Sequence, residues 1–76
     1  MDNTIGQGST VEMNPGYDYS GPAKRAFSQK RQGAVICIYG TELPLRDQDL
    51  HVKFPARNQR EKDIFVIGPR NMFVRP

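Results

Sequence analysis

The hydrophobic pattern of the chain centres on residues 34–39, Ala-Val-Ile-Cys-Ile-Tyr, which form a continuous run between Gly33 and Gly40. The run is short, bounded by glycines and rich in β-branched and aromatic side chains, so it favours a β-strand over a helix. Because hydrophobic residues occupy odd and even positions alike, both faces of this strand should be covered. Simple alternation would place Val35, Cys37 and Tyr39 on one face and Ile36 and Ile38 on the other.

Three further segments have the patterns of strands. Residues 50–54 alternate hydrophobic and polar side chains, as in a half-buried strand, and residues 64–67 form a second continuous hydrophobic run. Residues 68–71, Gly-Pro-Arg-Asn, are typical of a hairpin turn, and residues 72–74 return as a short last strand. Connections of this length favour antiparallel pairing. We therefore predict a mainly β fold, with a small antiparallel four-stranded sheet or open barrel over about residues 34–76.

A single short helix is predicted over about residues 22–32, before the sheet. Gly21-Pro22 suits a helix start, because proline is tolerated at the first helical position, and Gly33 suits the C-terminal stop. Phe27 is the one large hydrophobic side chain of this segment. A helix this short is marginal by itself, so we expect it to form by docking Phe27 on the sheet or on a partner.

Residues 1–20 have the composition of an extended or flexible arm. They are rich in glycine, asparagine, serine, threonine and proline, and their hydrophobic residues follow no period. Residues 1–33 contain nine hydrophobic residues against nineteen in residues 34–76, so the core should come from the later part of the chain. We therefore predict an arm over residues 1–20 and a single small β domain over residues 21–76, with the short helix at its start.

So small a core should need help from outside the chain. Domains of this size commonly depend on disulfides, metals or oligomerisation. One cysteine and one histidine exclude an internal disulfide and fit a structural zinc site poorly, so self-association or another protein subunit is expected. No run has the length of a membrane span and the first residues lack a signal-peptide pattern. A single thiol suits a reducing compartment, and we expect the cytoplasm or a particle assembled inside the cell.

The sequence offers little for catalysis. Residues 6–8, Gly-Gln-Gly, lack the third glycine of a nucleotide-binding loop, and residues 47–49, Asp-Gln-Asp, lack the later ligands of a calcium loop. Cys37 and His51 are the only possible pair of nucleophile and base. Cys37 lies inside the hydrophobic run, where a cysteine usually acts as a small core residue. We therefore predict no enzymatic activity, no metal, no cofactor and no small-molecule substrate.

The leading functional hypothesis is a structural or assembly protein that binds other protein subunits. Strands that are hydrophobic on both faces, a small core and sparse hydrophobic residues on the arm all motivate it. The arm would act as a clamp and an exposed strand edge would accept a partner strand, as in a virion component or an accessory of a large complex. The residues expected to contact the partner are Ile5, Val11, Phe27, Ile36 and Ile38.

The alternative hypothesis is a small nucleic-acid-binding module. Residues 20–33 carry four cations and no acid, and aromatic side chains lie within and just before this segment. Cations can contact phosphates while aromatic rings stack on bases. A solvated helix face is the competing interpretation of the same cations. The expected nucleic-acid contacts are Lys24, Arg25, Lys30 and Arg31, with Tyr17, Tyr19 or Phe27 for stacking.

Overall fold

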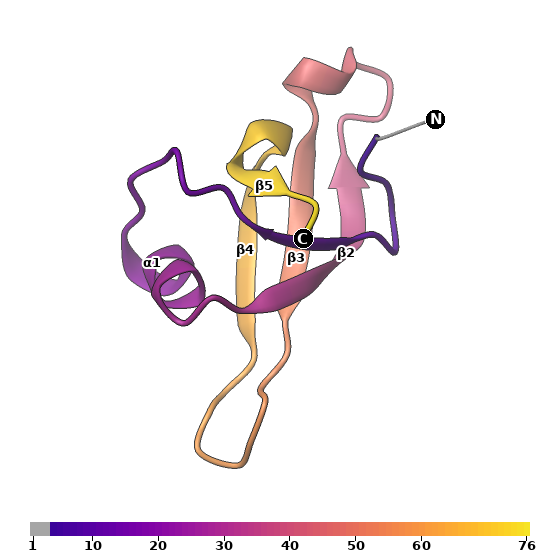
Figure 1. Cartoon of the computed structure of the whole chain (residues 1–76). Coiled ribbons are helices and arrows are strands. Elements are labelled where there is room, and N and C mark those ends of the chain that lie inside the picture. The colour runs from indigo at the N-terminus through magenta and orange to yellow at the C-terminus, as the bar shows by residue number, and fades with distance from the viewer. Residues whose placement is uncertain (1–3) are drawn as a thin grey trace.

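The computed structural model of the protein describes residues 4–76 and shows a five-stranded antiparallel sheet with one short helix (Figure 1). The strand order across the sheet is β4-β3-β2-β1-β5, and every neighbouring pair is antiparallel. No helix among these residues is long and hydrophobic enough to cross a membrane. The elements are β1 (Thr10–Met13), α1 (Gly21–Ser28), β2 (Gln32–Tyr39), β3 (Asp49–Phe54), β4 (Ile64–Pro69) and β5 (Phe73–Val74), with two 3₁₀ turns, η1 (Leu45–Asp47) and η2 (Arg70–Met72).

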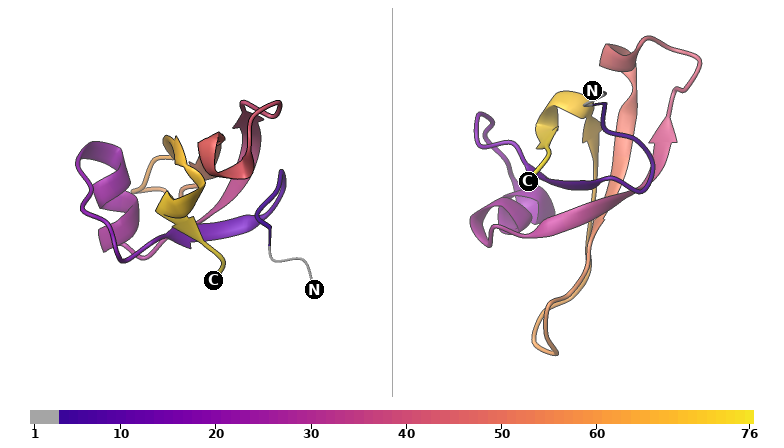
Figure 2. Two further views of the ribbon diagram at one scale, coloured as in Figure 1. Left: turned by 90° about the horizontal axis from the view of Figure 1, so that it is seen from above. Right: turned by 45° about the vertical axis from the view of Figure 1, so that its right-hand side comes forward.

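The sheet is strongly curled, because its two edge strands are close neighbours in the sequence. Only η2 separates the end of β4 at Pro69 from the start of β5 at Phe73. Four extended residues span at most about 14 Å, whereas the edges of a flat five-stranded sheet lie about 19 Å apart. The sheet therefore bends around the core, as Figure 2 shows from above. The hairpin between β3 and β4 projects away from this curled body (Figure 2).

The prediction of four strands was wrong, because the first part of the chain supplies a fifth. Residues of the expected arm form β1, which lies between β2 and β5 in the sheet. Val11 and Met13 point into the core and are buried, and Ala26 of α1 joins them there. Fully burying a valine or methionine side chain stabilises the folded state by about 1.5–3 kcal/mol. The core therefore does not come from residues 34–76 alone.

The helix is shorter than expected, because the chain leaves it before Gly33. Lys30 adopts a left-handed backbone with φ of 53°, and the next amide, that of Arg31, donates back to the carbonyl oxygen of Ala26 at 3.1 Å. This six-to-one hydrogen bond closes a helix end in the manner usually built on glycine. Ser28 is therefore the last residue of α1, and Lys30 makes the turn that we had assigned to Gly33.

Gly33 instead lies inside β2, where a side chain would not fit. It pairs with Val11 of β1, and a Cβ at this position would lie 2.8 Å from the carbonyl oxygen of Lys53 and 2.8 Å from a ring carbon of Phe54. Contacts this short do not occur between real side chains. The glycine thus lets β2 pass close over β3.

A β-bulge at Ile36 breaks the simple alternation of the central strand. Val35 pairs with Val52 and Cys37 pairs with His51, so Ile36 has no partner of its own on β3. An extra residue of this kind shifts the side-chain phase of everything after it. The expected division of the strand into two faces was therefore wrong. Val35 and Ile38 pack on the core, whereas Ile36, Cys37 and Tyr39 lie on the opposite face.

Candidate interaction surfaces

The outward face of β2, β3 and β4 carries a cluster of hydrophobic and aromatic side chains. On β3 the inward residues are fully buried, so the alternate residues point out. The same alternation on β4 places Phe65 and Ile67 outward, 52% and 57% exposed, and on β2 Ile36 and Tyr39 are 40% and 46% exposed. We call this surface the outer patch; it comprises Ile36, Cys37, Tyr39, His51, Phe65 and Ile67.

Three rings cross the outer patch from one strand to the next. The Tyr39 and His51 rings are stacked with centroids 6.1 Å apart, and the Tyr39 hydroxyl lies 3.3 Å from Nδ1 of His51. On the other side, Phe65 meets His51 edge to face at 5.9 Å. Such cross-strand aromatic pairs stabilise a sheet and hold the rings in place. The outer patch is therefore a set of side chains held in place on three neighbouring strands.

The outer patch is flanked along β3 by one acid and one base. Asp49 pairs with Tyr39 on one side, and Lys53 pairs with Phe65 on the other. Nζ of Lys53 lies 3.7 Å from Oδ2 of Asp63, and both side chains remain more than two-fifths exposed. Among residues 4–76, no ion pair involves Asp49. The outward residues of β3 therefore run in the order acid, imidazole, base.

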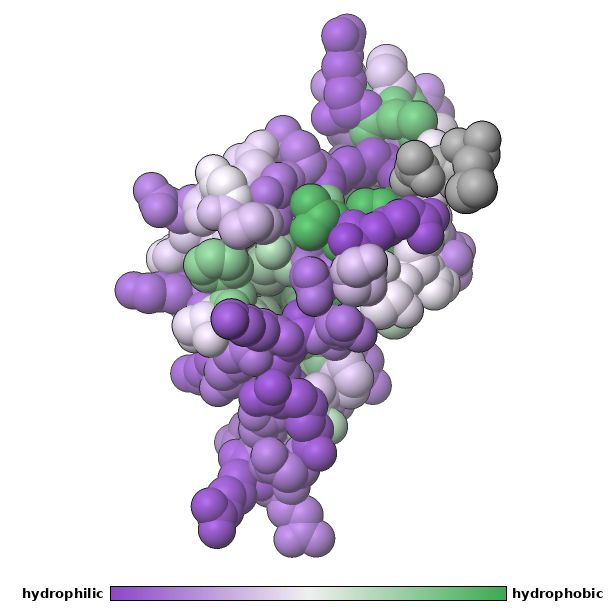
Figure 3. Space-filling view, in the orientation of Figure 1, coloured by the Kyte–Doolittle hydropathy of each residue, from purple (hydrophilic) through white to green (hydrophobic). Residues whose placement is uncertain are grey.

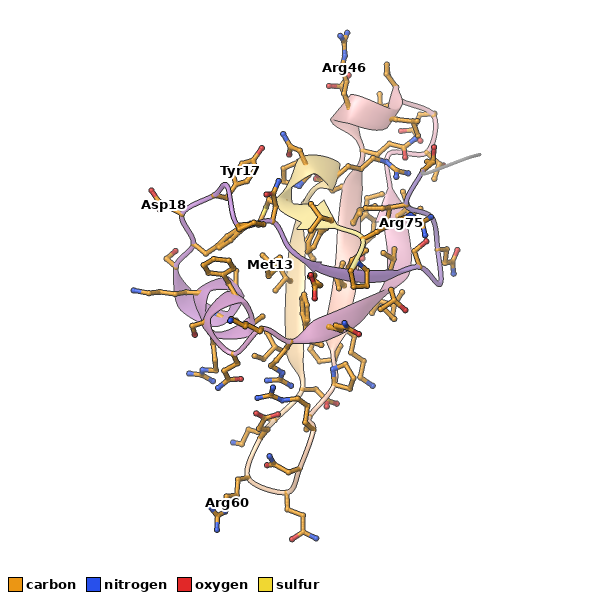
Figure 4. The ribbon with its side chains drawn as sticks, viewed as in Figure 1. Met13, Tyr17, Asp18, Arg46, Arg60 and Arg75 are labelled. Atoms are coloured by element: carbon orange, nitrogen blue, oxygen red, sulfur yellow. The ribbon has the colours of Figure 1, made fainter. Side chains whose placement is uncertain are left out.

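A second surface, which we call the cationic cleft, lies between α1 and the β3–β4 hairpin. The hairpin is almost uniformly hydrophilic (Figure 3), and Arg60 stands at its tip, far from Arg46 at the opposite end of the molecule (Figure 4). Four cations and one carboxylate face the cleft. Its lining residues are Arg25, Gln29, Arg31, Arg60, Glu61 and Lys62.

Arg31 is a structural part of the cleft wall. The residue is 2% exposed, and its Nη2 lies within hydrogen-bond distance of the carbonyl oxygens of Phe54 at 3.0 Å, Pro55 at 2.7 Å and Lys62 at 3.1 Å. A guanidinium with several fixed donors suits such a set of carbonyls. Arg31 therefore joins the end of α1 to both sides of the hairpin through Nη2.

The carboxylate of Glu61 fixes the hairpin to the helix through Arg57. Nε of Arg57 donates to Oε1 of Glu61 at 2.9 Å, and Nη1 of Arg57 donates to the carbonyl oxygen of Gln29 at 3.1 Å. The side-chain and backbone hydrogen bonds from Arg57 lower the pKa of Glu61 to about 2. Glu61 forms ion pairs with Arg57 and Arg31. Among the described residues, the remaining cations of the cleft have no ion pair: Arg25, Arg60 and Lys62.

Of the three aromatic side chains expected to stack on bases, two are partly buried and one is exposed. Tyr19 is half-buried, its ring lies 5.5 Å from that of Phe27, and its hydroxyl donates to the carbonyl oxygen of Asn14 at 2.6 Å. The pKa of the Tyr19 hydroxyl is raised, mainly by its burial and further by the nearby Tyr17 hydroxyl. Tyr19 and Phe27 thus hold α1 to the core. Tyr17 remains exposed in the loop between β1 and α1 (Figure 4).

The residues expected to contact a protein partner also differ in their exposure. Val11 is fully buried, and Ile38 is partly buried and packs on the core. Ile5 packs beside the core, and its carbonyl oxygen accepts a hydrogen bond from Arg70. Ile36 alone among the five lies on the outer patch. Of the expected phosphate contacts, Lys24, Arg25 and Lys30 are exposed and Arg31 is buried.

Cys37 and His51 are paired across β2 and β3. No hydrogen bond joins them in the part of the chain that the structure describes, and Nδ1 of His51 lies beside the Tyr39 hydroxyl. Cys37 is partly buried on the outer patch and lies outside the hydrophobic core, so its assignment as a core residue was wrong. Within residues 4–76, no group of three or more His, Cys, Asp or Glu side chains is placed to hold a metal ion.

Sequence reasoning missed several residues of these surfaces, among them Phe65, Ile67, Arg60 and Lys62. Phe65 and Ile67 belong to a continuous hydrophobic run, and such a run conceals which alternate members point outward. Arg60 and Lys62 lie in the polar connector after β3, and only the folded hairpin brings them beside α1. Comparisons of this chain with protein-family models, curated proteins and solved structures find no match.

Proposed function

We propose that the protein is a non-enzymatic assembly module that binds other protein subunits through the outer patch. The observation that carries this proposal is the exposure of four large hydrophobic side chains on one continuous sheet face: Ile36, Tyr39, Phe65 and Ile67. Contiguous exposed hydrophobic surface is costly in water and typically marks a site of protein interaction. Aromatic side chains supply much of the energy of such interfaces.

The proposal changes the binding element that we expected from the sequence. Residues 10–13 are built into the sheet as β1, and α1 packs beside β4, one of the two edge strands. A clamp made from the arm and the addition of a strand to an edge are therefore less suited to this fold than docking on the sheet face. The single thiol and the assembly role keep the cytoplasm, or a particle assembled inside the cell, as the expected location.

Site-specific photo-cross-linking tests this proposal. Phe65 is replaced by p-benzoylphenylalanine in the cells that naturally make the protein, and Tyr17, an exposed aromatic residue outside the outer patch, receives the same replacement as a control. We expect adducts with protein from position 65 and few from position 17. Absence of adducts from position 65 in folded, expressed protein would overturn the proposal.

A second candidate function is nucleic-acid binding at the cationic cleft. The specific observation that favours it is the set of three cations without an ion pair among residues 4–76, from two elements that face each other: Arg25, Arg60 and Lys62. Three phosphate contacts on a single strand would give a log–log salt slope of about −2. Exposed Tyr17 is the remaining candidate for stacking on a base.

A titration with labelled single-stranded oligonucleotides at two salt concentrations tests this second function. Replacing Arg25, Arg60 and Lys62 by alanine should abolish binding and its salt dependence. Arg46→Ala is the matched control, because this side chain is 85% exposed and lies at the other end of the molecule (Figure 4). Binding that persists unchanged in the triple variant would exclude the cleft as the site.

A further inference from the structure

We infer that the protein subunit that docks on the outer patch is a second copy of this chain, related by a twofold axis. This inference rests on the proposed function of the outer patch and specifies its occupant. It comes from the order of the outward side chains along β3, which is Asp49, His51 and Lys53. His51 stands midway between the acid and the base, so the strand carries opposite charges at equal distances from its centre.

Two sheets that pack face to face keep their strands roughly aligned, about 10 Å apart. A twofold axis in the plane between them can lie along the strands or across them. An axis along the strands places Asp49 over the second copy's Asp49 and Lys53 over the second copy's Lys53. An axis across the strands at His51 reverses β3, so that Asp49 lies over the second copy's Lys53 twice. Like charges oppose the first arrangement and opposite charges favour the second.

The two charged residues are free to take up these contacts. Asp49 has no ion pair among the described residues. The pair between Lys53 and Asp63 is exposed on both sides, and exposed pairs of this kind contribute little. Asp63 also accepts a 2.8 Å hydrogen bond from the amide of Ala56, which is the main reason for its lowered pKa. Lys53 can therefore turn toward a second copy while Asp63 keeps a partner.

The hydrophobic residues fit the same arrangement. The row Cys37–His51–Ile67 crosses the three strands at the level of the axis, so it would pack on its own counterpart. Phe65 shares a row with Lys53, and Tyr39 shares a row with Asp49. In the dimer, each of these two rows would lie over the other row of the second copy. An isologous interface of this kind needs one self-complementary surface and no other subunit. The expected product is a closed dimer held by a small hydrophobic centre with a charged pair at each end.

Charge reversal gives a direct test by analytical ultracentrifugation over about 10 μM to about 1 mM, a range suited to a small interface. We expect the wild-type chain to dimerise in this range. Asp49→Lys places lysine over lysine, and Lys53→Asp places aspartate over aspartate, so each variant alone should dimerise on the order of tenfold more weakly or worse. An equimolar mixture of the two variants places a lysine over every aspartate and should restore a dimer, now made of unlike chains.

Controls separate this effect from net charge and from misfolding. Asp47→Lys and Lys24→Asp change the net charge equally at exposed positions outside the outer patch, and each should keep wild-type dimerisation. Thermal melting confirms that every variant is folded, which matters for Lys53→Asp because Asp63 is near. Failure of the mixture to restore the dimer would overturn the twofold arrangement.

The outcome also distinguishes this inference from the proposed function. A wild-type chain that stays monomeric at the highest concentration would overturn self-association. If position 65 still cross-linked to a protein other than this chain, the outer patch would remain a protein-binding site with a different partner. An adduct of twice the mass of the chain supports both the proposed function and the second copy.

Discussion

Nη2 of Arg31 donates a hydrogen bond of 3.0 Å to the carbonyl oxygen of Phe54, at the point where β3 enters the projecting hairpin. The same guanidinium serves the carbonyl oxygens of Pro55 and Lys62. Removing these donors leaves the buried carbonyl of Phe54 without a partner, whereas the part-buried carbonyls of Pro55 and Lys62 can turn in part to water. A buried acceptor without a partner costs about 1–3 kcal/mol. We predict that Arg31→Ala lowers the free energy of unfolding by about 2–4 kcal/mol, measured by urea denaturation.

Arg25 provides the matched control for this prediction, because it is an exposed arginine of the same segment. Arg25→Ala should change the unfolding free energy by less than about 0.5 kcal/mol. Arg31→Lys should recover only part of the loss, since an ammonium group does not reproduce the planar donor set. Equal effects of the two alanine variants would show that Arg31 is a surface residue, as the sequence had suggested.

Gly33 gives a prediction about close packing. A methyl group there would lie 2.8 Å from atoms of Val52, Lys53 and Phe54, so β2 and β3 would have to separate. We predict that Gly33→Ala destabilises the protein by about 1–3 kcal/mol, seen as a lower melting temperature. Gly6→Ala is the control, because no atom lies within 4 Å of the added carbon. Similar melting temperatures for both variants would contradict the assigned role of Gly33.

The lowered pKa of Glu61 leads to a prediction of how the stability of the protein depends on pH. Hydrogen bonds from Arg57 hold the pKa of Glu61 at about 2, below the ordinary value of 4.5. A carboxylate whose pKa is lowered by folding stabilises the fold above its unfolded pKa, and that stabilisation is lost as the pH falls through the folded pKa. Glu61→Gln should therefore melt below the wild type at pH 7, and the difference should close between about pH 4.5 and pH 2.

The matched control for this titration is Glu42→Gln, which alters an exposed carboxylate that takes part in no ion pair among residues 4–76. At each pH, Glu42→Gln should melt at the same temperature as the wild type. A gap between wild type and Glu61→Gln that persisted at pH 2 would mean that the glutamine acts through packing and that the charge of Glu61 is not responsible.

The sequence predicted the later strands well, because their hydrophobic runs are long enough to show a pattern. The strands near residues 34–39, 50–54 and 64–67 are present in the sheet. β1 was missed because four residues with two inward side chains, Val11 and Met13, carry too short a signal among glycine and polar residues. Its strand character comes from pairing with β2 and β5, which are distant in the sequence.

The candidate surfaces were harder to predict than the strands. The bulge at Ile36 has no glycine or proline to mark it, and it reverses which later residues of β2 face outward. Arg31 was assigned to a phosphate contact because charge alone indicates the surface, whereas its buried position depends on carbonyl groups of the distant hairpin. Periodicity describes one strand at a time, and these features depend on how several strands meet.

The inferred dimer predicts a specific spacing between the two copies of Cys37. Cys37 pairs with His51 on the row through which the axis would pass, so the two thiols would face each other across packed sheets about 10 Å apart. A disulfide needs Cα atoms within about 7 Å. The sulfur atoms would project toward each other from backbones about 10 Å apart, so a short, flexible bismaleimide should cross-link the wild-type dimer, while oxidation with diamide should cross-link it poorly. Mass spectrometry of the linked product measures both.

The charge variants decide whether this cross-link reports the inferred axis. Asp49→Lys alone should lose the bismaleimide product, because lysine then faces lysine across the axis and the copies separate. Adding an equal amount of the Lys53→Asp chain should restore a product that contains one copy of each variant. If Asp49→Lys cross-linked as well as wild type, the thiols would be meeting by another arrangement, and the axis across β3 at His51 would be wrong.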